Sequence, residues 1–378
     1  MRIVIAPDSF KGTLDAASAA AALAQGVRLA RPDAIVNCVP MADGGEGTLN
    51  VLLAARNGQR REARATGPLG EPRTAAVGLI DGASTAIVEL AQIAGFSLLP
   101  ADRRDPLTAT TCGVGELIRA ALDSGVDRVL LTLGGSATVD GGAGMMQALG
   151  LRLLDANHRP LPERIGGGRL ADITYLDADA LYPALRTTRI LIAVDVLNPL
   201  CGPGGAARVF APQKGADAAA VARLEAGLTH WADLLEHYCG RTLRNEPGTG
   251  AAGGTAAPLL AMADAEIVPG VDLVIESVGL RDRLAGADLV ITGEGRLDGQ
   301  SVMGKVVGGV ARLAKSSGVP CMVVAGQFGP GFERLDDLIV SRISLADLAG
   351  NAEQARCAPA RWLVEAGRRL AASHAGQE

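Results

Sequence analysis

ADLVITGEGRLDGQSVMGKVVGGVARLAK, residues 287–315, is the stretch that decides the fold. Its apolar start predicts a strand over 288–292, and the glycines and acids of 293–298 predict a loop. A helix over about 301–316 follows. The same order of strand, loop and helix occurs twice at the start of the chain. Strands that are apolar on both faces are typical of a parallel sheet.

The alternation of strands and helices stops in the middle of the chain, where segments 74–80 and 85–90 predict antiparallel hairpins. We therefore predict an α/β protein of two domains. A discontinuous parallel-sheet domain is made of both chain ends, residues 1–60 and 285–378, and a mixed α/β domain is inserted at 61–284. We expect the active site in the cleft, because domain interfaces are favoured ligand sites. The strands expected in the parallel sheet are 2–6, 34–39, 288–292, 320–324 and 338–343.

Composition excludes several classes of function. The net charge is −5 and aromatic residues make up 3 % of the chain, which argues against a nucleic-acid or anionic-membrane partner. The six cysteines form no CxxC pair and the four histidines no HExxH motif, so neither a zinc site nor a disulfide framework is expected. No apolar run reaches transmembrane length. We expect a cytoplasmic protein, and a homodimer is compatible with this view.

Lysine is rare, and three of the four lysines adjoin a glycine: Lys11, Lys214 and Lys305. A compact ammonium group beside a residue without a Cβ suits a close-packed phosphate site. The alternative is that an arginine-rich sequence has kept these lysines by chance.

Residues 299–305 follow the phosphate-loop pattern GxxxxGK, but Val306 stands where a hydroxyl would bind Mg²⁺, which argues against a Walker-type nucleotidase. Ser301 could still cap the helix, and its amides with Lys305 could face an anion. In the preceding loop, Gly293 and Gly295 are candidate nucleotide-binding residues. Glu294 and Asp298 could supply oxygens to a metal ion, or serve only as turn and cap residues.

Two further glycine loops are candidates for phosphate binding. Gly134, Gly135, Ser136 and Thr138 follow a clear strand and could form an anion nest, or simply a tight turn.

The second of these loops is acidic. Asp43 and Glu46 lie among Gly44 and Gly45, an arrangement that suits Mg²⁺–phosphate or hydroxyl binding; the alternative is a cap for the helix that begins near Thr48.

Three polar residues follow predicted strands directly. Asp8 and Ser9 come after the first strand, where open α/β sheets bind ligands. Asp195 follows another strand and is a candidate base, or alternatively an Asx turn before Pro199. Because no histidine or cysteine site is available, carboxylates or lysines must carry acid–base chemistry. Phosphoryl transfer, which depends on positioning, Mg²⁺ and cations, is compatible with that inventory.

Taken in order, these segments strongly resemble the bacterial glycerate kinase family. The resemblance runs from about residue 1 to 375 and implies an ATP-dependent kinase that uses Mg²⁺ and converts D-glycerate to 2-phosphoglycerate. It also implies that the split domain is flavodoxin-like. The motifs are DSFKG at 8–12, MADGGEGT at 41–48, GGSATVDGGAG at 134–144, DVLNPLCGPGGA at 195–206, PQKGA at 212–216, GTGAAGG at 248–254 and TGEGRLD with GK at 292–305.

The set of loops, and not the family resemblance, motivates the following roles, which we state as a hypothesis. ATP phosphates lie against residues 134–136 and 293–299, where Lys305 and Lys214 neutralise charge. Lys11 or a nearby arginine holds the glycerate carboxylate. Asp195, or secondly Asp43, orients the 2-hydroxyl group. The expected Mg²⁺ ligands are Glu294, Asp298 and Glu46.

Other functions stay open at this point. A kinase of a related small hydroxy or sugar acid, such as hydroxypyruvate or tartronate, would use the same motifs, and 3-phosphoglycerate is an alternative product. A sensor that binds a nucleotide or a small acid without turnover belongs to a different class.

Overall fold

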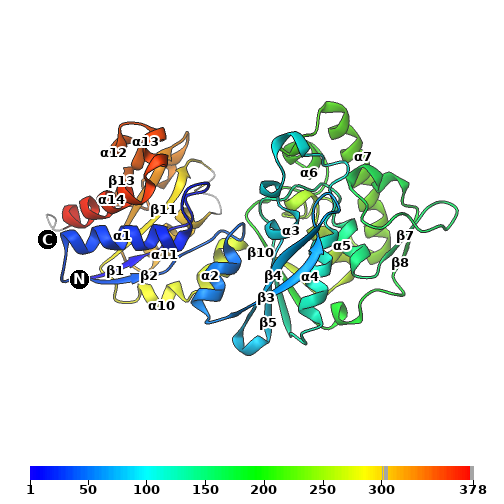
Figure 1. The fold of residues 1–378 in the computed structure, drawn as a ribbon, viewed down its shortest axis with the longest axis horizontal. Helices are drawn as coiled ribbons and strands as arrows, with labels where there is room; N and C mark the ends of the chain where they lie inside the picture. Colours follow the sequence, from blue (N-terminus) through cyan, green and yellow to red (C-terminus); the bar gives the residue numbers. More distant parts are fainter. Residues whose placement is uncertain (300, 302–304, 375–378) are drawn as a thin grey trace. The chain divides into compact units, whose positions relative to one another are not determined.

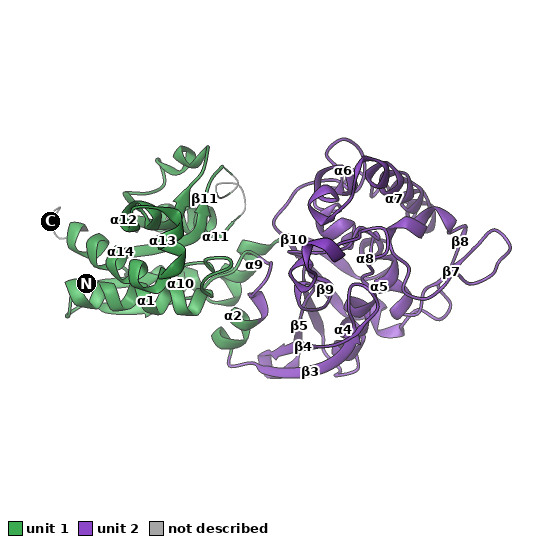
Figure 2. Ribbon diagram, turned by 45° about the horizontal axis from the view of Figure 1, so that its top comes forward, with its two compact units in different colours: residues 1–43, 50–56, 269–378 green, residues 44–49, 57–268 purple. Residues whose placement is uncertain are grey.

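The computed structural model describes residues 1–299, 301 and 305–374. The contacts within the chain divide it into two compact units, shown in Figures 1 and 2. Unit 1 comprises Met1–Asp43, Asn50–Arg56 and Pro269–Glu378, and unit 2 comprises Gly44–Leu49 and Asn57–Val268. Residues 269–284, which the sequence assigned to the insertion, therefore group with unit 1. The limits 1–60, 61–284 and 285–378 for independent domains stay a prediction.

Unit 1 contains one five-stranded parallel sheet, in the order β13-β12-β11-β1-β2. Counted along the chain within this unit, the order is 2-1-3-4-5, which is the flavodoxin-like arrangement. The predicted fold class is thus confirmed, with the insertion between the second and third strands. The strands are β1 (Arg2–Ile5), β2 (Ile35–Cys38), β11 (Leu289–Leu297), β12 (Cys321–Phe328) and β13 (Ser341–Ser344).

Helices cover this sheet, and two of them touch through glycines. In α1 and α14, a Cβ on Gly26 would lie 2.0 Å from the Val364 carbonyl oxygen, so this crossing requires glycine. On α11, a Cβ on Gly309 would lie 2.6 Å from Val271 Cγ2 of α9, so α9 packs closely on α11 within unit 1. The helices are α1 (Ala16–Ala30), α2 (Thr48–Ala55, at the junction of the units), α9 (Gly270–Ser277), α10 (Leu280–Leu284), α11 (Val306–Ser316), α12 (Leu345–Ala349), α13 (Ala352–Cys357) and α14 (Pro359–His374).

The expected loop at 293–298 is wrong, because β11 continues to Leu297 and β12 to Phe328. Glycine-rich sequence here permits close strand pairing. A Cβ on Gly293 would lie 2.2 Å from the Val324 carbonyl oxygen, and one on Gly326 would lie 2.3 Å from the Gly295 carbonyl oxygen. The central strands of the sheet are therefore longer than their apolar residues indicate.

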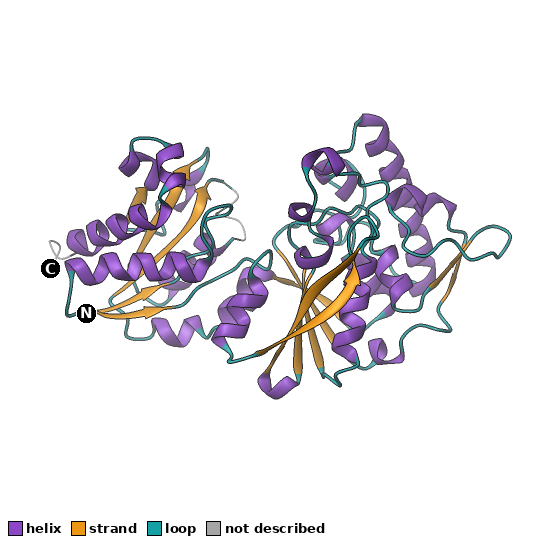
Figure 3. Ribbon diagram, in the orientation of Figure 1, coloured by secondary structure: helices purple, strands orange, loops and turns teal. Residues whose placement is uncertain are grey.

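Unit 2 is built on a mixed six-stranded sheet in the order β10-β9-β6-β5-β4-β3 (Figure 3). The predicted antiparallel hairpin is confirmed, since β3, β4 and β5 pair antiparallel, while β5, β6 and β9 run parallel. The strands are β3 (Gln59–Thr66), β4 (Pro72–Ile80), β5 (Thr85–Glu89), β6 (Arg128–Thr132), β9 (Arg189–Val194) and β10 (Ala265–Pro269), with a separate antiparallel pair of β7 (Arg152–Leu154) and β8 (Tyr175–Asp177).

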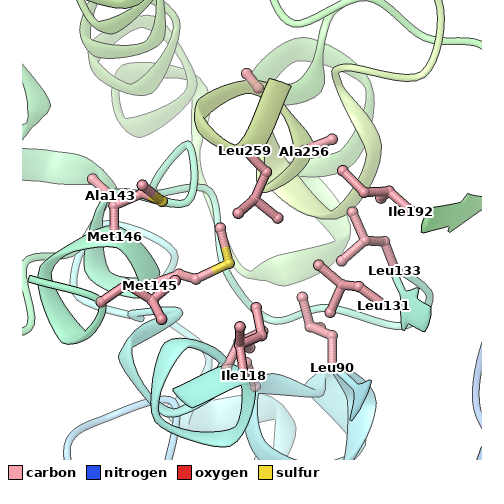
Figure 4. Packing of buried hydrophobic residues seen from close by; sticks show 14 of the residues in the cluster. Leu90, Ile118, Leu131, Leu133, Ala143, Met145, Met146, Ile192, Ala256 and Leu259 are labelled. Carbon is pink, nitrogen blue, oxygen red and sulfur yellow. The ribbon is translucent and has the colours of Figure 1, made fainter. Parts of the chain in front are cut away.

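Helices pack aliphatic side chains against the unit 2 sheet. Figure 4 shows part of this core, where Leu131 of β6 and Ile192 of β9 lie in one cluster with Met145 of α5 and Leu259 of α8. The helices are α3 (Ala91–Ala94), α4 (Cys112–Leu122), α5 (Ala143–Ala148), α6 (Ala206–Phe210), α7 (Ala218–Cys239) and α8 (Ala256–Met262).

Short 3-10 helices lie between the longer elements. They are η1 (Asp81–Ala83), η2 (Phe96–Leu98), η3 (Ala101–Arg103), η4 (Gly167–Asp172), η5 (Pro183–Arg186), η6 (Pro212–Lys214), η7 (Ala251–Gly253) and η8 (Phe332–Leu335).

Across the ranges that the structure describes, no helix combines the length and the apolar character needed to cross a membrane.

Candidate active site

The site of unit 1 lies where strand order reverses. The chain leaves the neighbouring strands β1 and β11 in opposite directions along the sheet, and this switch point is where open α/β sheets bind ligands. Asp8 follows β1, and Glu294 lies in the extension of β11. The Asp8 amide donates to the Gly293 carbonyl oxygen at 2.8 Å, which fixes the two segments side by side. Both predicted acids are buried, Asp8 to 4 % exposure and Glu294 to 5 %.

A cavity of about 240 Å³ opens beside these two acids, and all of its lining residues belong to unit 1. It brings together the motifs DSFKG and TGEGRLD with Lys305. Its size and mixed polarity suit a small polar ligand. The sequence reasoning missed Arg296, Gln327 and Arg356. The lining residues are Asp8, Ser9, Phe10, Lys11, Thr13, Glu294, Gly295, Arg296, Lys305, Gly326, Gln327, Leu345, Ala352, Ala355, Arg356 and Pro359.

Like charges crowd this site. Burial, followed by repulsion from Asp43, raises the pKa of Asp8 to about 8, and Lys11 opposes the rise. Burial also raises the pKa of Glu294 to about 7, against the effects of Ser301 and Lys305. Lys11 Nζ lies 3.6 Å from Asp43 Oδ2. Three predicted site acids and two predicted lysines are therefore electrostatic neighbours.

The expected cap at Ser301 is wrong. Helix α11 begins at Val306, its N-cap is Lys305, and no side chain caps it. The longer β11 moves the turn forward, so the Ser301 hydroxyl accepts from the Asp298 amide at 3.1 Å instead. Lys305 is half-buried and lines the cavity. Residues 300 and 302–304, which include Gly304 of the GxxxxGK pattern, lie outside the described residues.

In unit 2, a second group of motifs converges on the loop after β6. A Cβ on Gly134 would lie 2.4 Å from Gly45 Cα, so the two predicted glycine loops touch. A Cβ on Gly253 would lie 2.1 Å from the Thr138 carbonyl oxygen. Gly44 and Gly45 are buried, whereas Gly135 is exposed at the tip of the loop. The backbone packing leaves space only for glycine at these contacts.

Lys214 lies beneath the same loop. The residue is 4 % exposed, and its ammonium group donates to Ser136 Oγ at 2.6 Å and to the Thr138 carbonyl oxygen at 2.8 Å. Burial lowers the pKa of Lys214 to about 7, and the nearby Asp140 partly opposes this. The lysine thus fixes the conformation of the predicted phosphate loop from the inside.

Two buried acids support this region, and sequence reasoning missed both. Glu89, at the end of β5, accepts from the Gly47 and Leu49 amides at 3.1 and 2.9 Å, and so caps α2. Asp140 accepts from the Thr111 amide and hydroxyl at 2.8 and 2.7 Å. Burial raises the pKa of each acid. The available signal for Glu89 was its position at the end of an apolar strand.

The remaining predicted acids are less enclosed. Asp195 is exposed after β9, and Glu46 is exposed in unit 2. Asp298 Oδ2 lies 3.3 Å from Arg296 Nε. Within the described part of the chain, no three histidine, cysteine or acidic side chains converge as a metal site. Of the three predicted metal ligands, Glu294 and Asp298 belong to unit 1 and Glu46 belongs to unit 2.

Comparisons with known proteins agree with this arrangement. The chain matches the Glycerate kinase family over residues 3–375. It is 45 % identical over 355 residues to "Glycerate kinase" of Bacillus subtilis (strain 168), covering 92 % of each chain. It is 45 % identical over 326 residues to "Glycerate 2-kinase" of Escherichia coli (strain K12), covering 86 % of this chain and 85 % of that one.

A solved crystal structure from Salmonella typhimurium LT2, provisionally described as glycerate kinase 2, is 41 % identical to the chain. The TM-score is 0.84, and the match covers 100 % of this chain and 99 % of the other. Identity and coverage of this order, together with the family match, establish that the protein is a kinase and exclude the sensor without turnover. The chain belongs to the glycerate kinase family.

Proposed function

We propose that the protein transfers the γ-phosphoryl group of ATP to the 2-hydroxyl group of D-glycerate, giving 2-phosphoglycerate and ADP. The observation that carries this proposal is the cavity at the switch point of unit 1, where buried acids face Lys11, Lys305 and Arg356. Such a mixture suits a small anionic alcohol and a polyphosphate. The name of the Escherichia coli relative, glycerate 2-kinase, supports the choice of hydroxyl group.

The reaction requires few chemical groups from the protein. The substrate hydroxyl oxygen forms a bond to the γ-phosphorus, the bond from that phosphorus to the β–γ bridging oxygen breaks, and ADP leaves. The hydroxyl proton passes to a carboxylate. Asp195 and Asp43 are the two candidates; Asp43 is buried and lies beside Lys11, whereas Asp195 is exposed. Lys11 and Lys305 would neutralise the carboxylate and phosphate charge.

Mg²⁺ completes the proposal, since it neutralises phosphate oxygens during transfer. The residues present fit a hard cation. Glu294 Oε1 is buried and has no hydrogen-bond partner among the described residues, and its carboxylate belongs to the ligand class that Mg²⁺ prefers. Asp298 and Glu46 stay predicted ligands from the sequence.

The glycine loop of unit 2 is a second candidate for binding ATP phosphates. Gly134, Gly135 and Ser136 present backbone amides after a strand, as phosphate-binding loops do. Lys214 would act here by holding the loop.

The decisive test is ³¹P NMR of the product formed from ATP, Mg²⁺ and D-glycerate. A 2-phosphoglycerate resonance with equimolar ADP is expected, and a 3-phosphoglycerate resonance would overturn the proposed regiochemistry. An ADP-release assay with hydroxypyruvate, tartronate and sugar acids tests the substrate. If any of these compounds gave a higher kcat/KM than D-glycerate, that compound would be the preferred substrate and the proposed substrate would be wrong.

Location and partners belong to the same proposal. The six cysteines are all free thiols, which a reducing cytoplasm would preserve. We propose small-molecule partners alone, without nucleic acid or membrane; a homodimer stays a prediction that sedimentation would test.

A further inference from the structure

Two buried carboxylates at the switch point lie on adjacent segments of the chain. Asp8 and Glu294 are each at least nine-tenths buried, and both line the same cavity. The Asp8 amide is bonded to Gly293, the residue before Glu294. One oxygen of Asp8 is satisfied, because Oδ1 accepts from the Ser9 amide at 2.6 Å. The arrangement therefore directs carboxylate groups from two strands toward one space.

Acidic groups crowd one another in this space, although Lys11, Arg296, Lys305 and Arg356 also line the cavity. Asp8, Asp43 and Glu294 repel one another, while Lys11 is 63 % exposed and pairs with Asp43. Glu294 Oε1 is buried without a hydrogen-bond partner among the described residues. A buried carboxylate oxygen in that condition is destabilising unless a ligand completes it. A small cation would both bind this oxygen and reduce the repulsion.

We propose that Asp8 and Glu294 together bind one divalent cation of the magnesium class, and that they bind it in the nucleotide-free protein. The site rests on the proposed function for its role, and it replaces Asp298 and Glu46 by Asp8 as the partner of Glu294. Asp298 faces Arg296, and Glu46 is exposed in unit 2. Two protein carboxylates with several retained waters are the usual environment of Mg²⁺, so a third acidic ligand is not required.

The test uses Mn²⁺ as the probe with the full chain and no nucleotide. The electron paramagnetic resonance signal of free Mn²⁺ is followed as protein is added, and Mg²⁺ is then added as a competitor. One Mn²⁺ per chain, displaced by Mg²⁺, is expected for the wild type. Asp8→Asn and Glu294→Gln should each weaken Mn²⁺ binding at least about tenfold, because each removes a charged ligand. Glu353→Gln, at an exposed position on α13 of the same unit, should bind as the wild type does.

The result that overturns the site is specific. Mn²⁺ that fails to bind the nucleotide-free wild type, or that binds both variants with unchanged affinity, contradicts it. Because Asn and Gln keep the shape of the side chains, circular dichroism melts should show that the variants are folded. The wild-type titration stands independently of the variants in any case.

The same samples separate this site from the proposed reaction. If the wild type phosphorylates D-glycerate but binds no Mn²⁺ without ATP, the site is wrong and the function stands. If Mn²⁺ binds through Asp8 and Glu294 but no 2-phosphoglycerate forms, the function is wrong and the cation site stands.

Discussion

In unit 1 the buried carboxylates face a cavity, whereas in unit 2 a buried ammonium group lies beneath a loop. Glu294 keeps an oxygen without a protein partner among the described residues, and Asp8 is crowded by like charge. Lys214 instead donates to Ser136 and Thr138. Buried charge that faces a cavity favours a ligand; buried charge that is bonded to its own loop favours rigidity.

The comparison implies different responses to neutralisation. In unit 1, removing one of the crowded carboxylates should stabilise the fold and impair catalysis. The crowding costs stability, but it places the carboxylates where a ligand binds. In unit 2, removing a contact to the loop after β6 should disturb the conformation of that loop. Any loss of activity should follow from the disturbed loop. Substitutions in each unit test this distinction.

Asp8→Asn should lower kcat for D-glycerate by about 100-fold or more and raise the Tm by about 2 °C or more. The first effect follows from loss of an acid at the proposed reacting site, and the second from removal of a carboxyl group whose charged form is disfavoured by burial and then by Asp43. A coupled ADP-release assay and a calorimetric melt measure the two quantities. Asp33→Asn, an exposed turn residue of the same unit, is the matched control. A lower Tm together with the lost activity would identify Asp8 as a structural residue.

Gly134→Ala should destabilise unit 2 by about 2 kcal/mol, because its Cβ would lie 2.4 Å from Gly45 Cα and both backbones would have to shift. Urea unfolding in a Trp362→Phe background measures this, since the buried Trp231 then reports on unit 2 alone. The control is Gly204→Ala, whose nearest neighbour atom would be 4.0 Å away, and which should change stability by less than about 0.5 kcal/mol. Equal effects of the two substitutions would exclude a required contact between the loops.

The sequence was sufficient to place the five strands of the parallel sheet along the chain and to single out Asp8, Lys11 and Glu294 of the cavity, because apolar runs and acids after strands are local signals. It failed at Gly293–Leu297, where glycine indicated a loop but serves the close approach of β12. It also gave no sign that the ammonium group of Lys214 is buried below the loop and bonded to it. Both features depend on which backbone lies opposite, a long-range property that spacing does not encode.

Hydrogen bonds between residues far apart in the sequence could not be predicted either. Glu89 caps residues about 40 positions earlier, and Asp140 bonds to Thr111, 29 positions earlier. Neither relationship has a local motif. The cavity arginines, Arg296 and Arg356, become candidates only once β11 and α13 are seen to line one space.

Lys305→Ala should lower kcat/KM for ATP at least about tenfold, since one charged contact to phosphate is worth about 1.4 kcal/mol or more. Lys315→Ala is the matched control on the same helix. Lys315 is exposed and donates only to the Asp337 carbonyl oxygen at 3.0 Å among the contacts of the described residues, so its loss should leave the kinetics unchanged. Unchanged kcat and KM in Lys305→Ala would reject the phosphate role.

Lys214→Met should remove a pH dependence of stability that the wild type has. Burial lowers the pKa of Lys214 from 10.5 to about 7 in the folded protein. Between those values the unfolded chain binds the proton and the folded chain does not, so wild-type stability rises with pH relative to the variant. The slope is at most about 1.4 kcal/mol per pH unit. Below pH 7 the ammonium group is charged in both states and the two proteins should show parallel curves. Urea unfolding at pH 6, 7, 8 and 9 measures the difference. Lys214→Arg, which stays charged throughout, should show no such rise and the lowest stability. If the wild type and Lys214→Met have the same slope from pH 7 to 9, the lysine is solvated in the folded state, and the contrast between the two units disappears.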